Sequence, residues 1–182
     1  KYWFDLFTTC VIVLVYNELN EIALLRQSYL SDKYDVFVSG YIKAGESAEE
    51  TARREVKEEL GIDIERLEFA KTVWFDKGHS LMLGFIAYTK KQEFILSNEV
   101  DLARWVKDID VYKTLFPDCE GNAAFATYKE YLKKKLDELK KYKEEIKVIY
   151  EDKKDKYEKE KIMKIIITMI IKKQMVMIWK FK

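Results

Sequence analysis

The densest group of residues that could do chemistry is a run of glutamates between residues 46 and 59. If this segment is helical, Glu55, Glu58 and Glu59 fall within about a quarter-turn arc, because each residue advances a helix by roughly 100°. Carboxylates that close repel one another, and partial exclusion of water strengthens the repulsion. A hard divalent cation removes this cost, since Mg²⁺ prefers oxygen ligands and takes one or two carboxylates together with waters and phosphates. The spacing therefore predicts a metal site.

Basic residues on the same segment do not neutralise all of these acids. Arg53 and Arg54 each follow a glutamate by four residues, a spacing typical of ordinary surface ion pairs. Glu55 and Glu59 have no basic residue three or four positions away. We therefore expect the arginines to form ion pairs with the earlier glutamates. Glu55 and Glu59 are then expected to bind a cation that does not come from the helix.

A strand, a loop and a helix must position this cluster. The segment "YDVFVSG" reads as a strand that ends at Gly40, and Ser47 is placed to cap the helix that follows. Gly61 is placed to end it. An apolar stripe on this helix is expected to pack against a sheet and to leave the acids on a ridge beside it. The stripe consists of Ala48, Ala52, Val56 and Leu60.

Strand patterns elsewhere in the chain indicate the sheet that this helix covers. The predicted strands are "FTTCVIVLVY" (residues 7–16), "IALLRQ", "LEFAKTVWF", "SLMLGFIAY" and "ARWVKDID". A turn at Lys77–Gly78 joins the third and fourth of these. From Asn122 onward, apolar residues recur at three- and four-residue steps, which predicts a closing helix. Strands around one central helix with a second closing helix predict a single α/β sandwich.

Composition changes near the end of that sandwich. We assign residues 1–135 to the folded domain and residues 136–182 to a charged helical extension with an apolar, lysine-containing tail. Residues 151–182 are either an interaction helix or a non-native extension. Four apolar residues at heptad-like spacing would form a seam with a second copy in a homodimer, or would pack on the domain's own sheet. They are Leu132, Leu136, Leu139 and Ile146.

The bulk composition narrows the partners and the compartment. The chain has 182 residues, 48% of them hydrophobic, with a formal net charge of +1, so neither a nucleic-acid polymer nor an acidic membrane surface is expected as a partner. Cys10 and Cys119 lie far apart and form no metal or disulfide pattern, which favours the cytoplasm. The first residue is Lys1, and we expect that sequence is missing upstream.

The full register of the glutamate segment resembles the signature of the Nudix hydrolases. Every fixed position is present: Gly40, Glu46, Arg54-Glu55-Val56, Glu58-Glu59 and Gly61-Ile62. This resemblance covers roughly residues 7–135. It implies an α/β/α sandwich with a mixed β-sheet and a catalytic loop-helix. It also implies hydrolysis of a nucleoside diphosphate linked to another moiety, with Mg²⁺ or Mn²⁺ as cofactor and a nucleotide as substrate.

The resemblance also implies roles for individual residues. Glu55, Glu58 and Glu59 are the expected catalytic and metal-binding residues, and a backbone carbonyl near Gly40 or Ala44 would complete the metal shell. The general base is left open between Glu58 and a glutamate further along the chain. Residues with a structural role in the motif are Gly40, Glu46, Arg54 and Gly61, with Arg54 expected to pair with Glu46 at the loop–helix junction.

Two further segments resemble the NAD(H) pyrophosphatase branch. "SLMLGF" (residues 80–85) is similar to the end of that branch's signature, and Glu99 lies six residues before Trp105, where the branch places another metal-binding glutamate. The expected reaction is therefore cleavage of NADH or NAD⁺ into two mononucleotides. "TVWFDKGH" lacks the prolines of that branch, and the printed sequence does not include the zinc ribbon that precedes the domain in many of its members, as expected if the chain was cut just after it.

Other readings of the same motif stay open. The substrate could instead be ADP-ribose, a nucleotide sugar or another nucleoside diphosphate derivative. A binding module that senses a nucleotide without cutting it is the alternative outside the enzymes, although such modules often lose the carboxylates that this chain keeps.

Candidate substrate-binding residues flank the motif. Tyr41 directly follows the loop glycine, and Trp74 and Phe75 offer rings that could stack on a base, although aromatic residues in strands are more often core. Ser80 belongs to the branch-like segment. His79 is the single histidine, and local hydrogen bonding explains it more simply than proton transfer.

Overall fold

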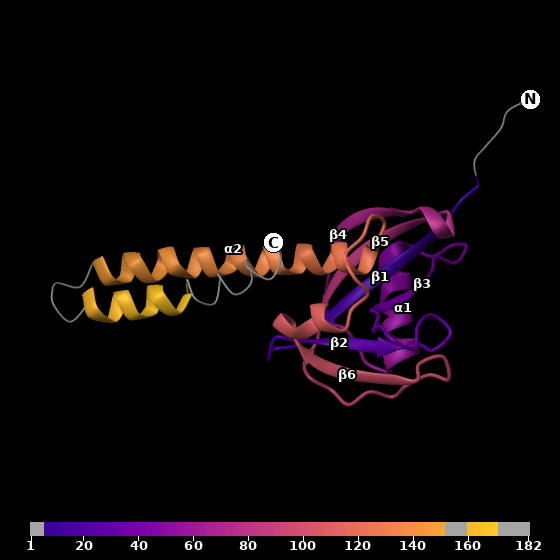
Figure 1. Cartoon of the computed structure of the whole chain (residues 1–182), viewed down its shortest axis with the longest axis horizontal. Coiled ribbons are helices and arrows are strands. Elements are labelled where there is room, and N and C mark those ends of the chain that lie inside the picture. Colours follow the sequence, from indigo (N-terminus) through magenta and orange to yellow (C-terminus); the bar gives the residue numbers. More distant parts are fainter. Residues whose placement is uncertain (1–5, 152–159, 171–182) are drawn as a thin grey trace, which may run out of the picture. The chain divides into compact units, whose positions relative to one another are not determined.

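The computed structural model describes residues 6–151 and 160–170, with residues 149–151 as backbone only (Figure 1). The chain divides into two compact units, residues 1–131 and residues 132–182. The elements of the described residues are β1 (Thr8–Tyr16), β2 (Glu21–Arg26), β3 (Val38–Tyr41), α1 (Ala48–Leu60), β4 (Arg66–Phe75), η1 (Asp76–Gly78), β5 (Ser80–Tyr88), β6 (Leu102–Lys107), η2 (Asp108–Lys113) and α2 (Ala123–Glu151).

Each strand predicted from the sequence is present, as are both predicted helices. The largest difference lies at the end of the last strand, where "ARWVKDID" was expected to stay extended. β6 ends at Lys107 and the chain winds into the 3₁₀ helix η2. The Tyr128 hydroxyl from α2 donates to the Asp108 carbonyl, and the Tyr131 hydroxyl donates to the Asp108 carboxylate. Contacts from α2 therefore hold this residue at the start of η2 instead of continuing the strand.

The described strands form one mixed sheet of six strands in the order β4-β5-β1-β2-β6, with β3 also paired to β1. β1 is parallel to β5 and antiparallel to β3. Its pairing with β2 is confined to the end of the strand, at Tyr16 and Ile22. One edge of β1 therefore pairs with two strands: its first half pairs with β3, and its last residue pairs with β2, which follows it in the chain. This brings the end of β2 and the start of β3 close to α1.

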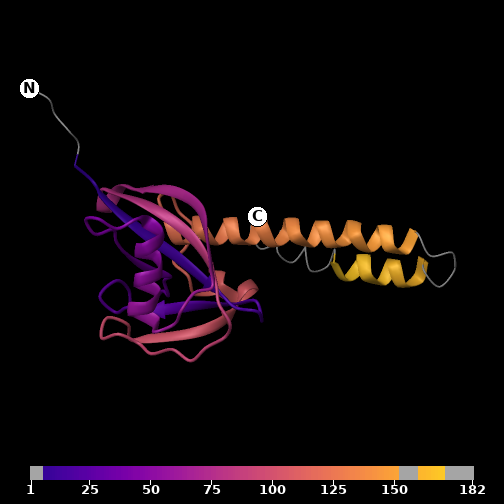
Figure 2. The ribbon, with the colours of Figure 1, turned by 180° about the vertical axis from the view of Figure 1, so that it is seen from behind.

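The two faces of the sheet are covered by different helices. Figure 2 shows α1 lying against the sheet. Alternate residues of β1, from Val11 to Val15, belong to the same buried cluster as the apolar side chains of α1. The opposite face meets the first turns of α2, where a Cβ on Gly84 would lie 2.4 Å from the Thr127 hydroxyl. The Tyr16 and Tyr131 rings also meet on this face, with centroids 5.2 Å apart. The predicted α/β/α sandwich with a mixed sheet is confirmed.

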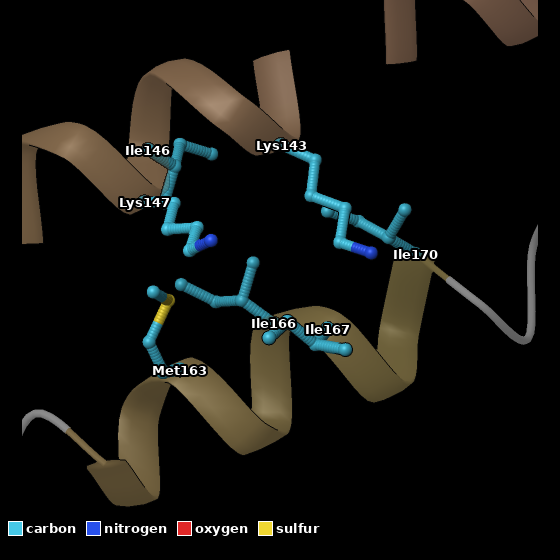
Figure 3. Close-up of a pocket in the computed structure, with 7 residues that line it drawn as sticks. All are labelled: Lys143, Ile146, Lys147, Met163, Ile166, Ile167 and Ile170. Carbon is cyan, nitrogen blue, oxygen red and sulfur yellow. The ribbon is translucent and has the colours of Figure 1, made fainter. Parts of the chain in front are cut away.

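The second unit contains the rest of α2 and a helix formed by residues 160–170. Figure 3 shows that side chains from these two helices line one small pocket. Ile146, Lys143 and Lys147 come from α2, opposite Met163, Ile166, Ile167 and Ile170. Ile146 was expected in a seam with a second copy or on the domain's sheet. It instead lines a pocket with the helix of residues 160–170 of the same chain. The remainder of the 151–182 tail, residues 152–159 and 171–182, lies outside the described residues.

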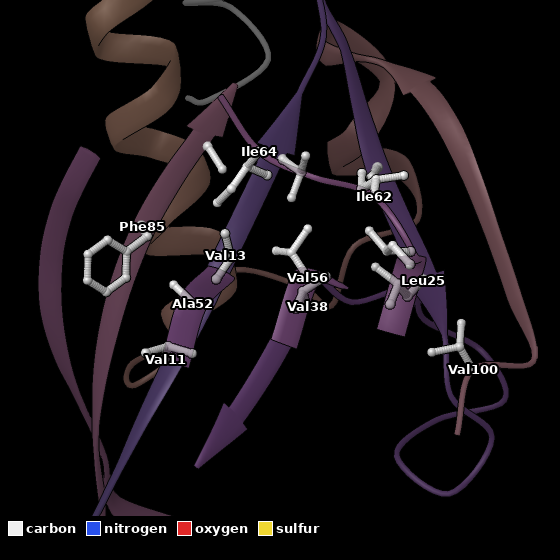
Figure 4. Close-up of a cluster of buried hydrophobic side chains, with 14 residues drawn as sticks. Val11, Val13, Leu25, Val38, Ala52, Val56, Ile62, Ile64, Phe85 and Val100 are labelled. Atoms are coloured by element: carbon white, nitrogen blue, oxygen red, sulfur yellow. The ribbon is translucent and has the colours of Figure 1, made fainter. Parts of the chain in front are cut away.

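The core of the first unit lies between α1 and the sheet. Ala52, Val56 and Leu60 are fully buried and contact the α1-facing residues of β1 and β2 (Figure 4). Ala48 packs at the edge of this cluster. The predicted apolar stripe is confirmed, and burying it stabilises the helix by on the order of 1–3 kcal/mol per large side chain. No helix among residues 6–151 and 160–170 is long and apolar enough to cross a bilayer.

Candidate active site

The start of α1 is fixed by a reciprocal pair of hydrogen bonds. The Glu50 amide donates to the Ser47 hydroxyl at 3.2 Å, and the Ser47 amide donates to the Glu50 carboxylate at 2.8 Å. This capping box satisfies backbone donors that a helix otherwise leaves unpaired. Glu46 lies just before it and receives bonds from the Thr51 hydroxyl and the Lys43 amide. The loop and the helix are thereby held in one geometry.

The end of α1 requires a glycine. Gly61 has a φ of 71°, the left-handed conformation, and its amide donates to the Lys57 carbonyl. A Cβ at this position would lie 2.6 Å from the Cβ of Ile95. Gly61 thus lets the loop before β6 pass directly over the helix end, where the Ile95 amide donates to the Leu60 carbonyl.

Arg54 is the centre of an ion-pair network at the loop–helix junction. Its Nε and Nη2 donate to the two carboxylate oxygens of Glu46, at 2.8 and 2.9 Å, so the expected pair is present and is bidentate. Its Nη1 also donates to Glu55 at 2.7 Å and to Glu58 at 2.9 Å. The bonds that Arg54 donates to Glu46 lower the pKa of Glu46 to about 2, with help from the Thr51 hydroxyl and the Lys43 amide. One guanidinium therefore orders three of the motif glutamates.

This network differs from the pairing expected from helical spacing. Glu50 closes the capping box instead of pairing with Arg54. Arg53 donates to the Ile64 carbonyl at 2.8 Å and so ties the helix to the chain beyond it. The expectation that Glu55 has no basic partner is also wrong, because Arg54 reaches its own sequence neighbour. The guanidinium is long enough to do this, whereas a helical wheel compares only side chains three and four residues apart.

Glu59 is buried, not placed on an exposed ridge as expected. Only 4% of it is accessible, and its Oε1 accepts a hydrogen bond from the Gln27 amide at 3.1 Å. Its Oε2 is buried and has no hydrogen-bond partner among the described residues. Burial, together with the charges of Glu55 and Glu99, raises the pKa of Glu59 to about 8, against the Gln27 bond and a backbone contact from Ser39 that lower it. A buried carboxylate with one unpaired oxygen is costly unless a cation occupies the site.

Glu55 lies directly over Gly40 of β3. A Cβ on Gly40 would come within 2.0 Å of the Glu55 carboxyl carbon, so the missing side chain leaves the space that the carboxylate fills. Burial raises the pKa of Glu55, although Arg54 opposes this. Glu58 differs, since 52% of its side chain is exposed. The three glutamates therefore run from fully buried to solvent-facing across one end of α1.

Glu99 joins this group from the loop before β6. It is exposed, and its charge acts on both Glu59 and Tyr29. Tyr29, in the loop after β2, is itself 68% exposed. Partial burial, and then the charges of Glu59, Glu99 and Glu55, raise the pKa of Tyr29, so its side chain lies near the acidic cluster. The predicted ligand Glu99 and the motif glutamates are thus in the same region.

Sequence reasoning missed Tyr29 and Gln27. Gln27 is 1% exposed, and it follows directly after the apolar strand β2. The available signal was a polar residue in a run of otherwise buried positions, and buried polar groups require partners. Tyr29 carried no such signal, because nothing in its local pattern distinguishes it from an ordinary loop tyrosine.

Three of the predicted substrate-binding residues lie elsewhere on the sheet. Strand alternation places the Tyr41 side chain on the face opposite Gly40, and its carbonyl accepts from Arg54. The Trp74 ring contacts Phe7 and His79 on the hairpin of β4 and β5. Ser80 is 4% exposed, and its hydroxyl is bonded to Thr8 and the Gly78 carbonyl, so its described contacts lie within the hairpin.

Phe75 belongs to the same hairpin. Its ring lies against Gly78, where a Cβ would come within 2.7 Å of it, and 39% of the residue is exposed. No described contact joins Phe75 or Trp74 to the acidic cluster. The hairpin aromatics and the cluster are therefore separate features of the domain.

The acidic cluster fits a divalent cation in donor type and in unused oxygens. The fit rests on the unpaired, buried Oε2 of Glu59 and on the carboxylate of Glu55 that fills the Gly40 notch. Both are hard oxygen donors of the kind that Mg²⁺ and Mn²⁺ take. Within residues 6–151 and 160–170 no three metal-binding side chains are already gathered. Arg54 holds one oxygen of Glu55 and one of Glu58.

Comparison with known proteins places this site in a family. The sequence profile of the NUDIX domain matches residues 6–126. Curated relatives include "NAD-capped RNA hydrolase NudC" of Stutzerimonas stutzeri (strain A1501), 35% identical over 87 residues, which are 47% of this chain and 32% of the relative. "Nudix hydrolase 19, chloroplastic" of Arabidopsis thaliana is 36% identical over 112 residues, 58% of this chain and 26% of the relative. The chain thus spans about a third or less of these relatives.

Solved structures share the fold. The NUDIX domain of Shewanella oneidensis NrtR, complexed with ADP ribose, aligns with a TM-score of 0.59 and 17% identity over 72% of this chain and 90% of that one. The MutT protein of Methanosarcina mazei Go1 aligns with a TM-score of 0.55 and 24% identity over 71% of this chain and 94% of that one. The match to the family profile covers well over half of the sequence. The chain belongs to the NUDIX domain family.

Proposed function

We propose that this chain is a divalent-metal-dependent hydrolase that cleaves the diphosphate linkage of an NAD-type dinucleotide. The reaction class follows from the acidic cluster at the end of α1. The substrate class is supported by the "SLMLGF" segment, by Glu99 six residues before Trp105, and by relatives named for the hydrolysis of NAD-capped RNA.

The observation that carries the proposal is the buried carboxylate of Glu59. A carboxylate that is 4% exposed, with one oxygen unpaired and two further acids acting on it, costs stability in the absence of a cation. Such strain is typical of sites that bind something. Glu59 and Glu55 are the proposed metal ligands, and Glu58 and Glu99 lie on the solvent side of them.

A bound Mg²⁺ or Mn²⁺ would supply the charge that polarises the phosphoryl oxygens and neutralises the transition state. The protein's own contribution is to hold the carboxylates in place. Arg54 fixes Glu55 and Glu58 from one side while it anchors the loop through Glu46. Gly40 leaves the space for Glu55, and the capping box fixes the start of the helix that carries all three acids.

Hydrolysis also needs a group that takes a proton from the attacking water. Glu58 and Glu99 are both exposed and both belong to the cluster, so each can reach a water on the solvent side. Arg54 already occupies one oxygen of Glu58. Glu99 accepts no side-chain hydrogen bond within the described part of the chain, and we assign it as the proton acceptor.

The experiment that tests the proposal is a substrate panel with a matched pair of variants. The full chain is incubated with NADH, an NAD-capped RNA oligonucleotide, ADP-ribose and a nucleotide sugar, with Mg²⁺ or Mn²⁺ and with chelator, and the products are separated by anion-exchange chromatography. We expect metal-dependent release of two mononucleotides from NADH, and a loss of kcat of about 100-fold or more in Glu59→Gln. Glu49→Gln, on the same helix but outside the cluster, is the control and should keep its activity.

Two outcomes would contradict the proposal. Equal turnover by wild type and Glu59→Gln would remove the cluster from the reaction. Tight nucleotide binding without product after long incubation with Mn²⁺ would make the chain a sensing module instead of an enzyme.

A further inference from the structure

Gln27 is a buried side chain that none of the motif residues accounts for. It follows β2, it is 1% exposed, and its single described side-chain bond is the 3.1 Å donation to Oε1 of Glu59. The carbonyl oxygen of the same amide is buried without a partner among the residues that the structure describes. Burying an amide with its acceptor unpaired costs folding free energy. A functional role for the remaining bond, from the Gln27 amide to Glu59, would explain why such a residue is present.

The orientation of the amide follows from its neighbour. When Glu59 is ionised, as a metal ligand must be, turning the amide over would place the Gln27 carbonyl against the carboxylate, where two acceptors would face each other. With the amide nitrogen on Oε1, the carboxylate cannot rotate freely, and its Oε2 is left as the oxygen without a protein partner. The bond therefore decides which oxygen of Glu59 is available.

We propose that Gln27 is a positioning residue that holds Glu59 so that Oε2 is presented to the metal. The inference rests on the proposed function, because it assigns a purpose to the metal-binding carboxylate. It concerns a residue outside the motif and on a different element, joined to Glu59 across 32 positions of sequence. Groups that orient a metal ligand are commonly worth 10- to 100-fold in metal affinity.

The test measures Mn²⁺ binding to the full chain without nucleotide, by the loss of the free-ion electron paramagnetic resonance signal. Gln27→Met keeps the length of the side chain and removes the donor. Gln92→Met is the matched control, since Gln92 is exposed and donates to the Asp63 carbonyl and the Thr89 hydroxyl. We expect Mn²⁺ affinity to fall by about 10- to 100-fold in Gln27→Met and to stay within about twofold of wild type in Gln92→Met.

A second variant protects the test against a folding defect. Gln27→Asn keeps an amide but is one methylene too short to reach Glu59, so it should weaken Mn²⁺ binding in the same direction. The concentration of Mn²⁺ needed for half-maximal activity should rise in parallel in both variants. A general loss of structure would instead lower activity without moving that concentration.

Different results overturn different claims. If folded Gln27→Met or Gln27→Asn binds Mn²⁺ as tightly as wild type, Gln27 does not position Glu59 and the inference fails. If wild type binds no Mn²⁺, or if Glu59→Gln binds it equally well, the proposed function itself fails.

Discussion

Gly40 and Glu55 occupy one space between them: a Cβ on the glycine would lie 2.0 Å from the carboxyl carbon and from Oε1 of the glutamate. The two residues belong to different elements, β3 and α1, and the absent side chain of one makes room for the carboxylate of the other. The spacing between the loop glycine and the helix glutamates in the motif thus has a direct steric meaning.

We therefore predict that Gly40→Ala separates function from stability. The added methyl must displace the Glu55 carboxylate, which lies at the end of a flexible side chain, so the free energy of unfolding should change by only about 1 kcal/mol. Mn²⁺ affinity and kcat should fall by about tenfold or more, since a ligand has moved. Isothermal titration calorimetry and urea unfolding measure both quantities. Ser39→Ala, one residue away, is the control; equal metal binding by Gly40→Ala and wild type would contradict the assignment of Glu55.

Arg54 is predicted to stabilise the domain by keeping three acids together. Arg54→Ala leaves Glu46, Glu55 and Glu58 without their shared cation, and partial burial of the pair with Glu55 makes the loss larger than for a surface pair. We expect the free energy of unfolding to fall by about 1–3 kcal/mol in urea. Lys57→Ala, which breaks an exposed pair with Asp63, should cost less than about 1 kcal/mol. Equal costs in the two variants would show that the network contributes no more than a surface ion pair.

The pKa of Glu59 predicts an unusual pH dependence for the metal-free protein. The folded pKa is about 8 against an ordinary value of 4.5, so the folded state binds more protons between these values and stability falls as pH rises. Glu59→Gln, which cannot ionise, should therefore match wild type below pH 4.5. At pH 8 with chelator it should be more stable by about 2–4 kcal/mol.

Thermal unfolding across pH 4–9 in chelator measures this difference. Saturating Mg²⁺ should raise the melting temperature of wild type at pH 8 and leave that of Glu59→Gln unchanged, because ligands stabilise the state that binds them. The same pH profile for both proteins in chelator would contradict the burial of a titrating Glu59.

The capping box at the start of α1 gives a smaller prediction. Ser47→Ala removes the hydroxyl that accepts the Glu50 amide and should cost about 0.5–2 kcal/mol of unfolding free energy. Ser39→Ala, in β3, again serves as the control in chemical denaturation. If the two alanine variants unfold together, the cap makes no net contribution.

The sequence predicted most of the fold because local signals and burial agree. The strand patterns, Ser47 as the cap and Gly61 as the stop were all sufficient to place the elements. The apolar stripe of α1 also identified the buried face. Such features depend on periodicity and on backbone chemistry, which are visible in a single chain.

Less of the site than of the fold could be predicted from the sequence. A helical wheel places Glu59 beside the stripe but does not show that the end of β2 covers it, so its burial and its bond to Gln27 were missed. The Arg54–Glu46 pair was predicted, but the further bonds from Arg54 to Glu55 and Glu58 were missed, since they depend on how far the guanidinium reaches in the folded chain. Substrate binding by Tyr41 stays a prediction, although strand alternation places its side chain on the face opposite Gly40.

The most direct test of the proposed metal site is to locate a divalent ion bound to the folded chain. A crystal soaked in Mn²⁺ and measured for anomalous scattering should show a peak beside Oε2 of Glu59 and the Glu55 carboxylate. That peak should be absent from crystals of Glu59→Gln soaked in the same way. A wild-type crystal with no peak there, and with Glu55 and Glu58 still bonded to Arg54, would contradict the proposed metal site.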